Sequence, residues 1–204
     1  MSEKRLEDAL KSMKDGDLLL FRQKSLISCL GRGSYSHAAM FAWWNGEPFC
    51  LEVLQGVGGR AIHLRQAVRE NPGQYDVFRA NHEERWGSFD RQRCVQYMSC
   101  LMGCRYGYEG ILKVSLLHLP LVRLFLRANT DDSSCAEEFP FCSQAVTMAY
   151  RLGGNVDPVP QLADHYTEPS DLARSPFFGF LFSLLPDKEE KEMEVILYEA
   201  GYRK

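Results

Sequence analysis

The dipeptide Asn45-Gly46 lies between two apolar runs, and this arrangement strongly constrains the fold of the chain. Asn-Gly favours a tight hairpin, because both residues accept the positive φ angles that a type I′ turn requires. The flanking runs, 37–43 and 48–54, therefore predict two antiparallel strands. Two further short apolar runs, Leu18–Phe21 and Tyr75–Arg79, predict additional strands in the same half of the chain.

The second half of the chain shows helical periodicity instead. Apolar residues recur at helical spacing across 88–101, and the run 141–152 is followed by Gly153-Gly154, a common helix stop. The segment 111–126 predicts another helix with a break before Pro120. Strands followed by helices, without regular βαβ alternation, indicate the α+β class.

Length and charge limit the class of protein. The chain has 204 residues, which is long enough for one hydrophobic core, so we expect a single domain over 1–185 and a charged tail over 186–204. Its 24 Lys and Arg stand against 27 Asp and Glu, and no basic stripe is present. This balance argues against a nucleic-acid partner.

The segment 1–17 is charged and lacks the apolar core of a secretory signal, so we expect a cytoplasmic protein. The apolar stretch 111–126 is interrupted by Lys113, Pro120 and Arg123, and a membrane span needs about 20 mostly apolar residues. We therefore expect no transmembrane segment, although peripheral contact with lipid stays open.

The seven cysteines are an odd number, which indicates free thiols in a reducing compartment. Cys100 and Cys104 would share one face of a helix, but no CxxC pair or nearby His completes a zinc site. We expect no metal and no cofactor.

His37 opens the first strand of the predicted hairpin, directly after a loop that contains glycines. A strand end fixes the ring while the loop leaves it accessible, as a general base requires. Glu52 interrupts the apolar run of the neighbouring strand, and a buried carboxylate there needs a partner such as a protonated imidazole. A structural histidine at a strand end and a glutamate on a solvent face are the alternatives.

Cys142 begins the predicted helix 141–152, just after a loop that contains Pro140. A helix N-terminus lowers the pKa of a thiol, and its N–H groups can bind the oxyanion of a tetrahedral intermediate. A buried core cysteine is the alternative, since six other cysteines are present. The position at a helix start distinguishes Cys142 from them.

Together, these segments resemble the permuted branch of the NlpC-type papain-like cysteine peptidases, the YiiX-like amidases. The resemblance implies a circularly permuted papain-like fold, with a small antiparallel sheet or barrel packed against a helical half, because His precedes Cys. It extends over about residues 14–175 and rests on five motifs: Gly16-Asp17 before an apolar strand, Ser36-His37-Ala38-Ala39-Met40, Leu51-Glu52-Val53, Phe141-Cys142-Ser143-Gln144 and Thr167-Glu168-Pro169-Ser170-Asp171-Leu172.

By this resemblance, Cys142 is the nucleophile, His37 the base and Glu52 the orienting group. Tyr106 is the candidate oxyanion or substrate-binding residue, with Tyr108 in reserve. The resemblance implies hydrolysis of an amide through a thioester acyl-enzyme. The implied substrate is a murein-type peptide, a γ-glutamyl amide or a lysyl amide of cell-wall origin, and the implied source is bacterial or phage.

Two other functions stay open at this point. An acyltransferase or thioesterase of the lecithin retinol acyltransferase type has the same order of His and Cys, and the apolar stretches 111–126 and 177–185 would suit it. However, Cys142 does not lie in the Asn-Cys-Glu-His setting of that group. A non-catalytic binding module that merely retains the three residues is the third function. The oligomeric state is open.

Overall fold

The computed structural model describes residues 2–22, 34–105 and 140–187. The described helices are α1 (Leu6–Leu10), α3 (Leu64–Glu70), α4 (Arg91–Cys100), α7 (Cys142–Met148) and α8 (Pro169–Arg174), with a π-helical turn at Ala149–Gly153 and a 3-10 turn at Asp164–Tyr166. The described strands are β1 (Glu3–Arg5), β2 (Leu18–Phe21), β3 (His37–Trp44), β4 (Glu47–Leu54), β5 (Gly58–His63), β6 (Tyr75–Ala80) and β7 (Phe178–Leu185).

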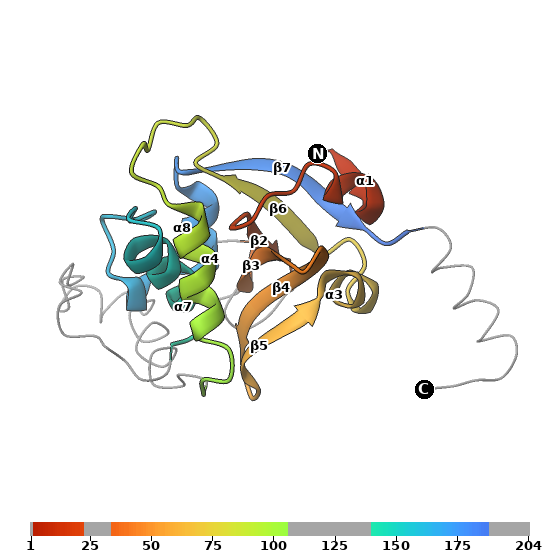
Figure 1. Cartoon of the computed structure of the whole chain (residues 1–204), viewed down its shortest axis with the longest axis horizontal. Helices are drawn as coiled ribbons and strands as arrows, with labels where there is room; N and C mark the ends of the chain where they lie inside the picture. The colour runs from red at the N-terminus through yellow and green to blue at the C-terminus, as the bar shows by residue number, and fades with distance from the viewer. Residues whose placement is uncertain (1, 23–33, 106–139, 188–204) are drawn as a thin grey trace, which may run out of the picture.

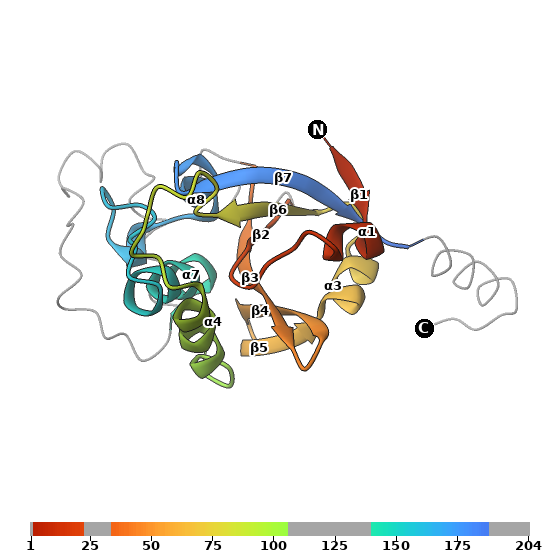
Figure 2. The same ribbon diagram turned by 45° about the horizontal axis from the view of Figure 1, so that its top comes forward.

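The described strands form one sheet in the order β1-β7-β6-β2-β3-β4-β5. Neighbouring strands are antiparallel, except that β1 and β7 run parallel. The sheet curves, with α4, α7 and α8 on one side and α1 and α3 on the other (Figures 1 and 2). The expected α+β class is therefore confirmed, but the sheet is larger than the small antiparallel sheet we expected, and helices cover both of its faces.

The central strands explain why helices lie on both faces. Leu18 and Leu20 of β2 pack into the core beside α4 and α7, whereas Leu19 packs into the core beside α1 and α3. All three side chains have no exposed surface. A strand that is apolar at every position must be covered on both sides, as β2 is here.

The predicted hairpin is confirmed at the turn and in both strands. Asn45 has a φ of 51° and Gly46 a φ of 81°, so both adopt the left-handed conformation of a type I′ turn. The resulting register pairs Ala39 of β3 with Glu52 of β4. This register places the glutamate two positions along the ladder from the start of β3.

Two elements differ from what the local sequence favours. Gly58 and Gly59 favour a turn, but residues 58–63 form β5 and pair with β4 along their whole length. Leu6, Leu10 and Met13 have helical spacing, but residues 3–14 are divided into β1 and the short α1, because β1 pairs with β7 at the edge of the sheet. At residues 3–5 a long-range strand pairing overrides the local pattern, whereas β5 forms a second hairpin with β4 across the turn at 55–57.

The remaining predictions fall partly outside the described residues. The expected helix over 111–126 and the tail from residue 188 onward lie there. Asp187, which we assigned to the tail, is anchored: its carboxylate accepts from the backbone N–H of Glu7 (3.1 Å) and from Arg65 Nη1 (3.0 Å). Across the described ranges, every helix is too short or too polar to span a membrane.

Candidate active site

The hairpin brings His37 and Glu52 into direct contact. His37 is the first residue of β3, and its Nε2 lies 2.6 Å from Glu52 Oε2 on β4. The side chains are 13% and 2% exposed, respectively. An ionised carboxylate only accepts hydrogen bonds, so Nε2 carries a proton and Nδ1 is left for another partner.

Cys142 is that other partner. It is the first residue of α7, which packs against β3 and β4, and it is 3% exposed. The His37 ring and the backbone N–H groups of Ala38 and Ser143 interact with its sulfur. The structure therefore brings together Cys142, His37 and Glu52, which the sequence had placed on three separate segments.

The charges of the three groups reinforce one another. Burial alone would lower the pKa of His37, but the Cys142 thiolate and the Glu52 carboxylate raise it to about 10. Burial alone would raise the pKa of Cys142, but the His37 imidazolium and the two backbone N–H groups lower it below its ordinary 9.0. The two shifts favour a thiolate–imidazolium pair, in which each charge stabilises the other.

Arg60 is a site residue that the sequence prediction missed. It lies directly opposite Glu52 in the β4–β5 ladder, and its Nε and Nη2 atoms lie 2.7 and 2.6 Å from Glu52 Oε1. Burial alone would raise the pKa of Glu52, but His37 and Arg60 together lower it. One carboxylate oxygen therefore bonds His37 and the other bonds Arg60, which keeps Glu52 ionised although it is buried.

The segment 167–172, one of the motifs noted in the sequence, connects the two sides of the site. Ser143 Oγ donates to the carbonyl of Thr167 (2.7 Å), which fixes the first turn of α7. Ser170 Oγ accepts from the backbone N–H of Tyr35 (3.4 Å), two residues before His37. This segment therefore helps to hold Cys142 and His37 in position relative to each other.

The expected oxyanion site falls only partly within the described residues. The first hydrogen bond of α7 runs from the Ala145 N–H to the Phe141 carbonyl (2.9 Å), so the Cys142 N–H has no acceptor within the helix. Tyr106 and Tyr108, the two expected oxyanion or substrate-binding residues, lie outside the described residues. Their roles stay predictions.

The ion pair predicts a characteristic pH dependence. Alkylation of Cys142 by iodoacetamide should have its midpoint below pH 9, because the pKa of the thiol is lowered from 9.0. Turnover should fall near pH 10, where His37 loses the proton that a leaving amine needs, whereas alkylation should continue because the thiolate persists. Both profiles are measured by mass spectrometry, and an alkylation midpoint at or above pH 9 would contradict the ion pair.

Arg60 is expected to act as a positioning residue. Replacing Arg60 with methionine should lower kcat/KM about tenfold, because Glu52 loses a charge-assisted hydrogen bond. The pH midpoint for alkylation of Cys142 should also rise, because a less ionised Glu52 stabilises the His37 imidazolium less.

The matched control for this change is Arg65→Met. The Arg65 side chain is 39% exposed, against 36% for Arg60. Its Nη1 bonds the carboxylate of Asp187, which is not one of the three site residues. If both variants left the alkylation profile of the wild type unchanged, Arg60 would have no positioning role.

Comparisons with known proteins give a match to a solved structure that has a similar fold. No family model matches the chain, and no curated protein matches it significantly. A solved structure, that of the metalloprotein yiiX from Escherichia coli O157:H7 (DUF1105), matches with a TM-score of 0.56 and 15% identity, over 85% of this chain and 98% of that chain. That protein is described as a metalloprotein, but no group of three or more His, Cys, Asp or Glu in the described part of this chain could hold a metal. The comparison shows that this chain has a YiiX-like fold.

Proposed function

We propose that this protein is a cysteine hydrolase with a circularly permuted papain-like arrangement. The observation that carries the proposal is the convergence of three side chains from separate elements: Cys142 on α7, His37 on β3 and Glu52 on β4. A core cysteine needs neither a hydrogen-bonded imidazole nor a lowered pKa, so the alternative of a structural thiol does not explain this arrangement.

The proposed reaction is hydrolysis of an amide through a thioester. The Cys142 thiolate attacks the carbonyl carbon, and the Cys142 N–H donates to the oxyanion that forms. His37 then gives its Nδ1 proton to the nitrogen of the leaving amine as the C–N bond breaks. Water attacks the thioester and gives a proton back to His37, and the carboxylic acid leaves as the sulfur departs as a thiolate.

Glu52 has a separate task in this reaction. Its carboxylate holds the proton of His37 on Nε2 and stabilises the imidazolium, while Arg60 keeps the carboxylate itself ionised. In this geometry His37 presents Nδ1 to the sulfur in both half-reactions. The same group therefore acts first as acid and then as base.

The proposed substrate follows from the family resemblance of the sequence motifs. Relatives of that family cleave amides in cell-wall peptides, so we propose a murein-type peptide or a γ-glutamyl or lysyl amide as the substrate class. Transfer of the acyl group to an alcohol or amine would use the same thioester and differs only in the group that attacks it.

A single experiment tests the enzyme class and the substrate together. The protein is incubated at pH 6 with iodoacetamide and, separately, with a γ-D-glutamyl-diaminopimelate peptide, and both reactions are followed by mass spectrometry. Rapid single alkylation at Cys142 together with cleavage of the peptide is the expected result.

Other outcomes separate the alternatives. Alkylation without cleavage would retain the cysteine enzyme but reject this substrate, and acyl lipids with an added amine acceptor would be tried next. Slow and uniform alkylation of the cysteines would reject the catalytic proposal and leave a binding module.

A further inference from the structure

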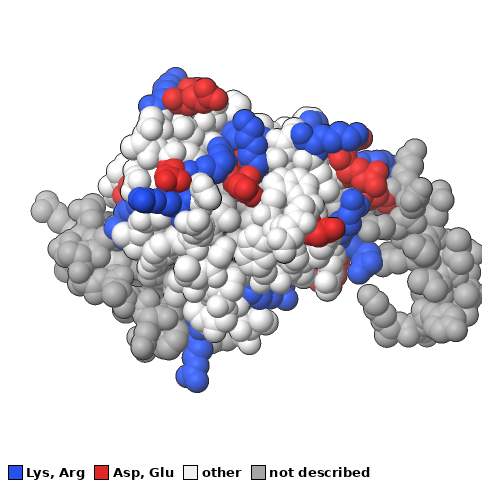
Figure 3. Space-filling model, in the orientation of Figure 1, with Lys and Arg blue, Asp and Glu red and all other residues white. Residues whose placement is uncertain are grey.

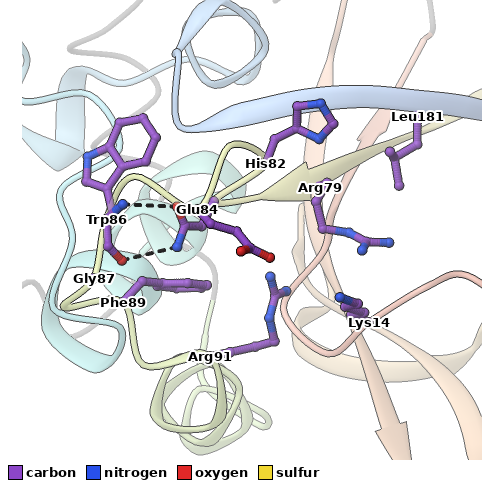
Figure 4. Close-up of a pocket in the computed structure, with 10 residues that line it drawn as sticks. Lys14, Arg79, His82, Glu84, Trp86, Gly87, Phe89, Arg91 and Leu181 are labelled. Atoms are coloured by element: carbon purple, nitrogen blue, oxygen red, sulfur yellow. Dashed lines mark hydrogen bonds between the residues drawn. The ribbon is translucent and has the colours of Figure 1, made fainter.

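A cavity lies away from the three residues of the candidate active site, Cys142, His37 and Glu52. It has a volume of about 540 Å³ and is lined by residues around the end of β6, the loop that follows it and the start of α4 (Figure 4). The strand register shows the separation: His37 pairs with the last residue of β2, Phe21, whereas Arg79 of the cavity follows Phe78, the partner of Leu18 at the other end of β2. Four strand residues span about 10 Å, so the cavity and the candidate active site are at opposite ends of β2.

One wall of the cavity contains two arginine side chains that are held in place by a buried carboxylate. Arg79 Nε and Arg91 Nη1 lie 2.9 and 3.3 Å from the carboxylate of Asp17, which has no exposed surface. Arg91 Nη2 also donates to the carbonyl of Ala80 (2.8 Å). Arg79 Nη2 also donates to the carbonyl of Ser12, Arg91 Nη1 to the carbonyl of Asp15, and the Arg91 guanidinium lies 5.2 Å from the ring centroid of Phe89. These contacts fix both guanidinium groups while the side chains stay 16% and 27% exposed, and each group keeps N–H donors beyond those that these contacts use.

The charge of this wall is not balanced within the described residues. Lys14 also lines the cavity, and across the described ranges its ammonium group takes part in no ion pair. Glu84 lines the opposite side, and its carboxylate points towards the arginines (Figure 4). The cavity and the groups behind it therefore contain three cations, Lys14, Arg79 and Arg91, and two carboxylates, Asp17 and Glu84. Figure 3 shows positive and negative side chains interspersed over the face drawn there, without a broad basic field.

The other wall of the cavity is aromatic and is also fixed. The side-chain amide of Asn81 accepts from the N–H of Trp86 (3.2 Å) and donates to its carbonyl (3.1 Å), as the dashed lines in Figure 4 show. Trp86 and Phe89 both pack edge-to-face on Phe177, with ring centroids 5.2 and 5.1 Å apart. A ligand would therefore meet a preformed wall and would not have to order it.

We propose that this cavity binds a small organic anion. A carboxylate or phosphate group of the ligand bonds Lys14, Arg79 and Arg91, and a planar apolar body packs against Trp86 and Phe89. The volume lies within the range of about 300–1,000 Å³ that is typical of small-molecule sites, and a few polar groups beside aromatic walls are typical of their lining. The site is independent of the proposed catalytic function, because Cys142, His37 and Glu52 do not line it.

The proposal is tested by NMR titration of the indole N–H signals with phenyl phosphate. The chain has three tryptophans, and the signal that Trp86→Phe removes identifies Trp86. We expect a saturable shift of this signal in both the wild type and Cys142→Ala, with little change at Trp43 and Trp44. Phenylacetate should bind as well, whereas phenylacetamide, which lacks the charge, should bind at least tenfold more weakly.

Charge variants supply the decisive comparison. Lys14→Met should weaken binding of phenyl phosphate about tenfold, while Lys11→Met, which removes an equal charge from an exposed lysine outside the cavity, should not change it. Glu84→Gln should tighten binding about threefold, because it removes the carboxylate that opposes the anion.

Three outcomes would overturn the proposal. The first is the absence of a saturable shift at Trp86 with phenyl phosphate or phenylacetate. The second is equal binding of phenylacetamide, which would mean that the cations do not recognise the ligand. The third is inorganic phosphate binding as tightly as phenyl phosphate, which would mean that the aromatic wall contributes nothing.

Discussion

Replacing Cys142 with alanine is expected to lower kcat/KM for the cleaved amide by about 10⁴-fold or more, while the protein stays folded. Without the sulfur no thioester can form, and only binding and the oxyanion site remain to accelerate attack by water. The change removes one atom from a packed site, so the loss of stability should be small compared with that of a larger core truncation. The measurement is turnover of the γ-D-glutamyl-diaminopimelate peptide, with circular dichroism as the test of folding.

Cys94→Ala is the matched control for this prediction. Cys94 is also buried in a helix, but burial raises the pKa of its thiol, and its sulfur lies 4.0 Å from the sulfur of Met40. The Cys94→Ala variant should therefore keep the turnover of the wild type and the rapid alkylation of Cys142 at pH 6. Equal turnover of Cys142→Ala and wild type would show that another residue is the nucleophile.

Replacing Glu52 with glutamine is expected to lower kcat/KM by about 10³-fold, through the position of a proton. The glutamine oxygen would face Arg60, which only donates, so the amide NH₂ would face His37 Nε2. Nε2 would then accept a hydrogen bond from the glutamine amide. The proton of the neutral ring would move to Nδ1, the nitrogen that faces the Cys142 sulfur. In that tautomer His37 cannot accept the proton of Cys142.

The alkylation profile distinguishes this effect from a general loss of structure. In Glu52→Gln the midpoint for Cys142 should move up towards 9.0, the ordinary pKa of a thiol. Glu47→Gln is the matched control, because Glu47 also bonds a histidine, His63, at 3.0 Å, but it is 64% exposed and lies at the far end of β4. A wild-type alkylation profile in Glu52→Gln would rule out the orienting role.

The parts of the fold that the sequence predicted are those that local chemistry determines. The turn at Asn45-Gly46 requires positive φ, and few other dipeptides supply it at both positions. Once the turn is given, alternation along β3 and β4 places His37 and Glu52 on the same side of the hairpin. The contact between these two side chains therefore follows from about fifteen consecutive residues.

The parts that the sequence did not predict depend on contacts that the local pattern of residues does not reveal. The glycines at 58 and 59 favour a turn locally, and β5 forms there only because it extends the ladder of β4. Arg60 was missed for the same reason, since only that ladder places it opposite Glu52. The anion cavity is a sharper case, because Arg79 and Arg91 are unrelated in the sequence and meet through the buried Asp17, which also accepts from the backbone N–H of Lys14.

The order of the three site residues along the chain has a consequence for biosynthesis. The proposed base, His37, and its carboxylate partner Glu52 belong to one hairpin near the N-terminus, whereas Cys142 follows about 90 residues later, on a helix that packs against β3 and β4. A ribosome therefore releases the His37–Glu52 hairpin first, and the Cys142 thiol should keep its ordinary, weakly reactive form until α7 has packed. Chemical reactivity at Cys142 is in this sense the last property that the nascent chain acquires.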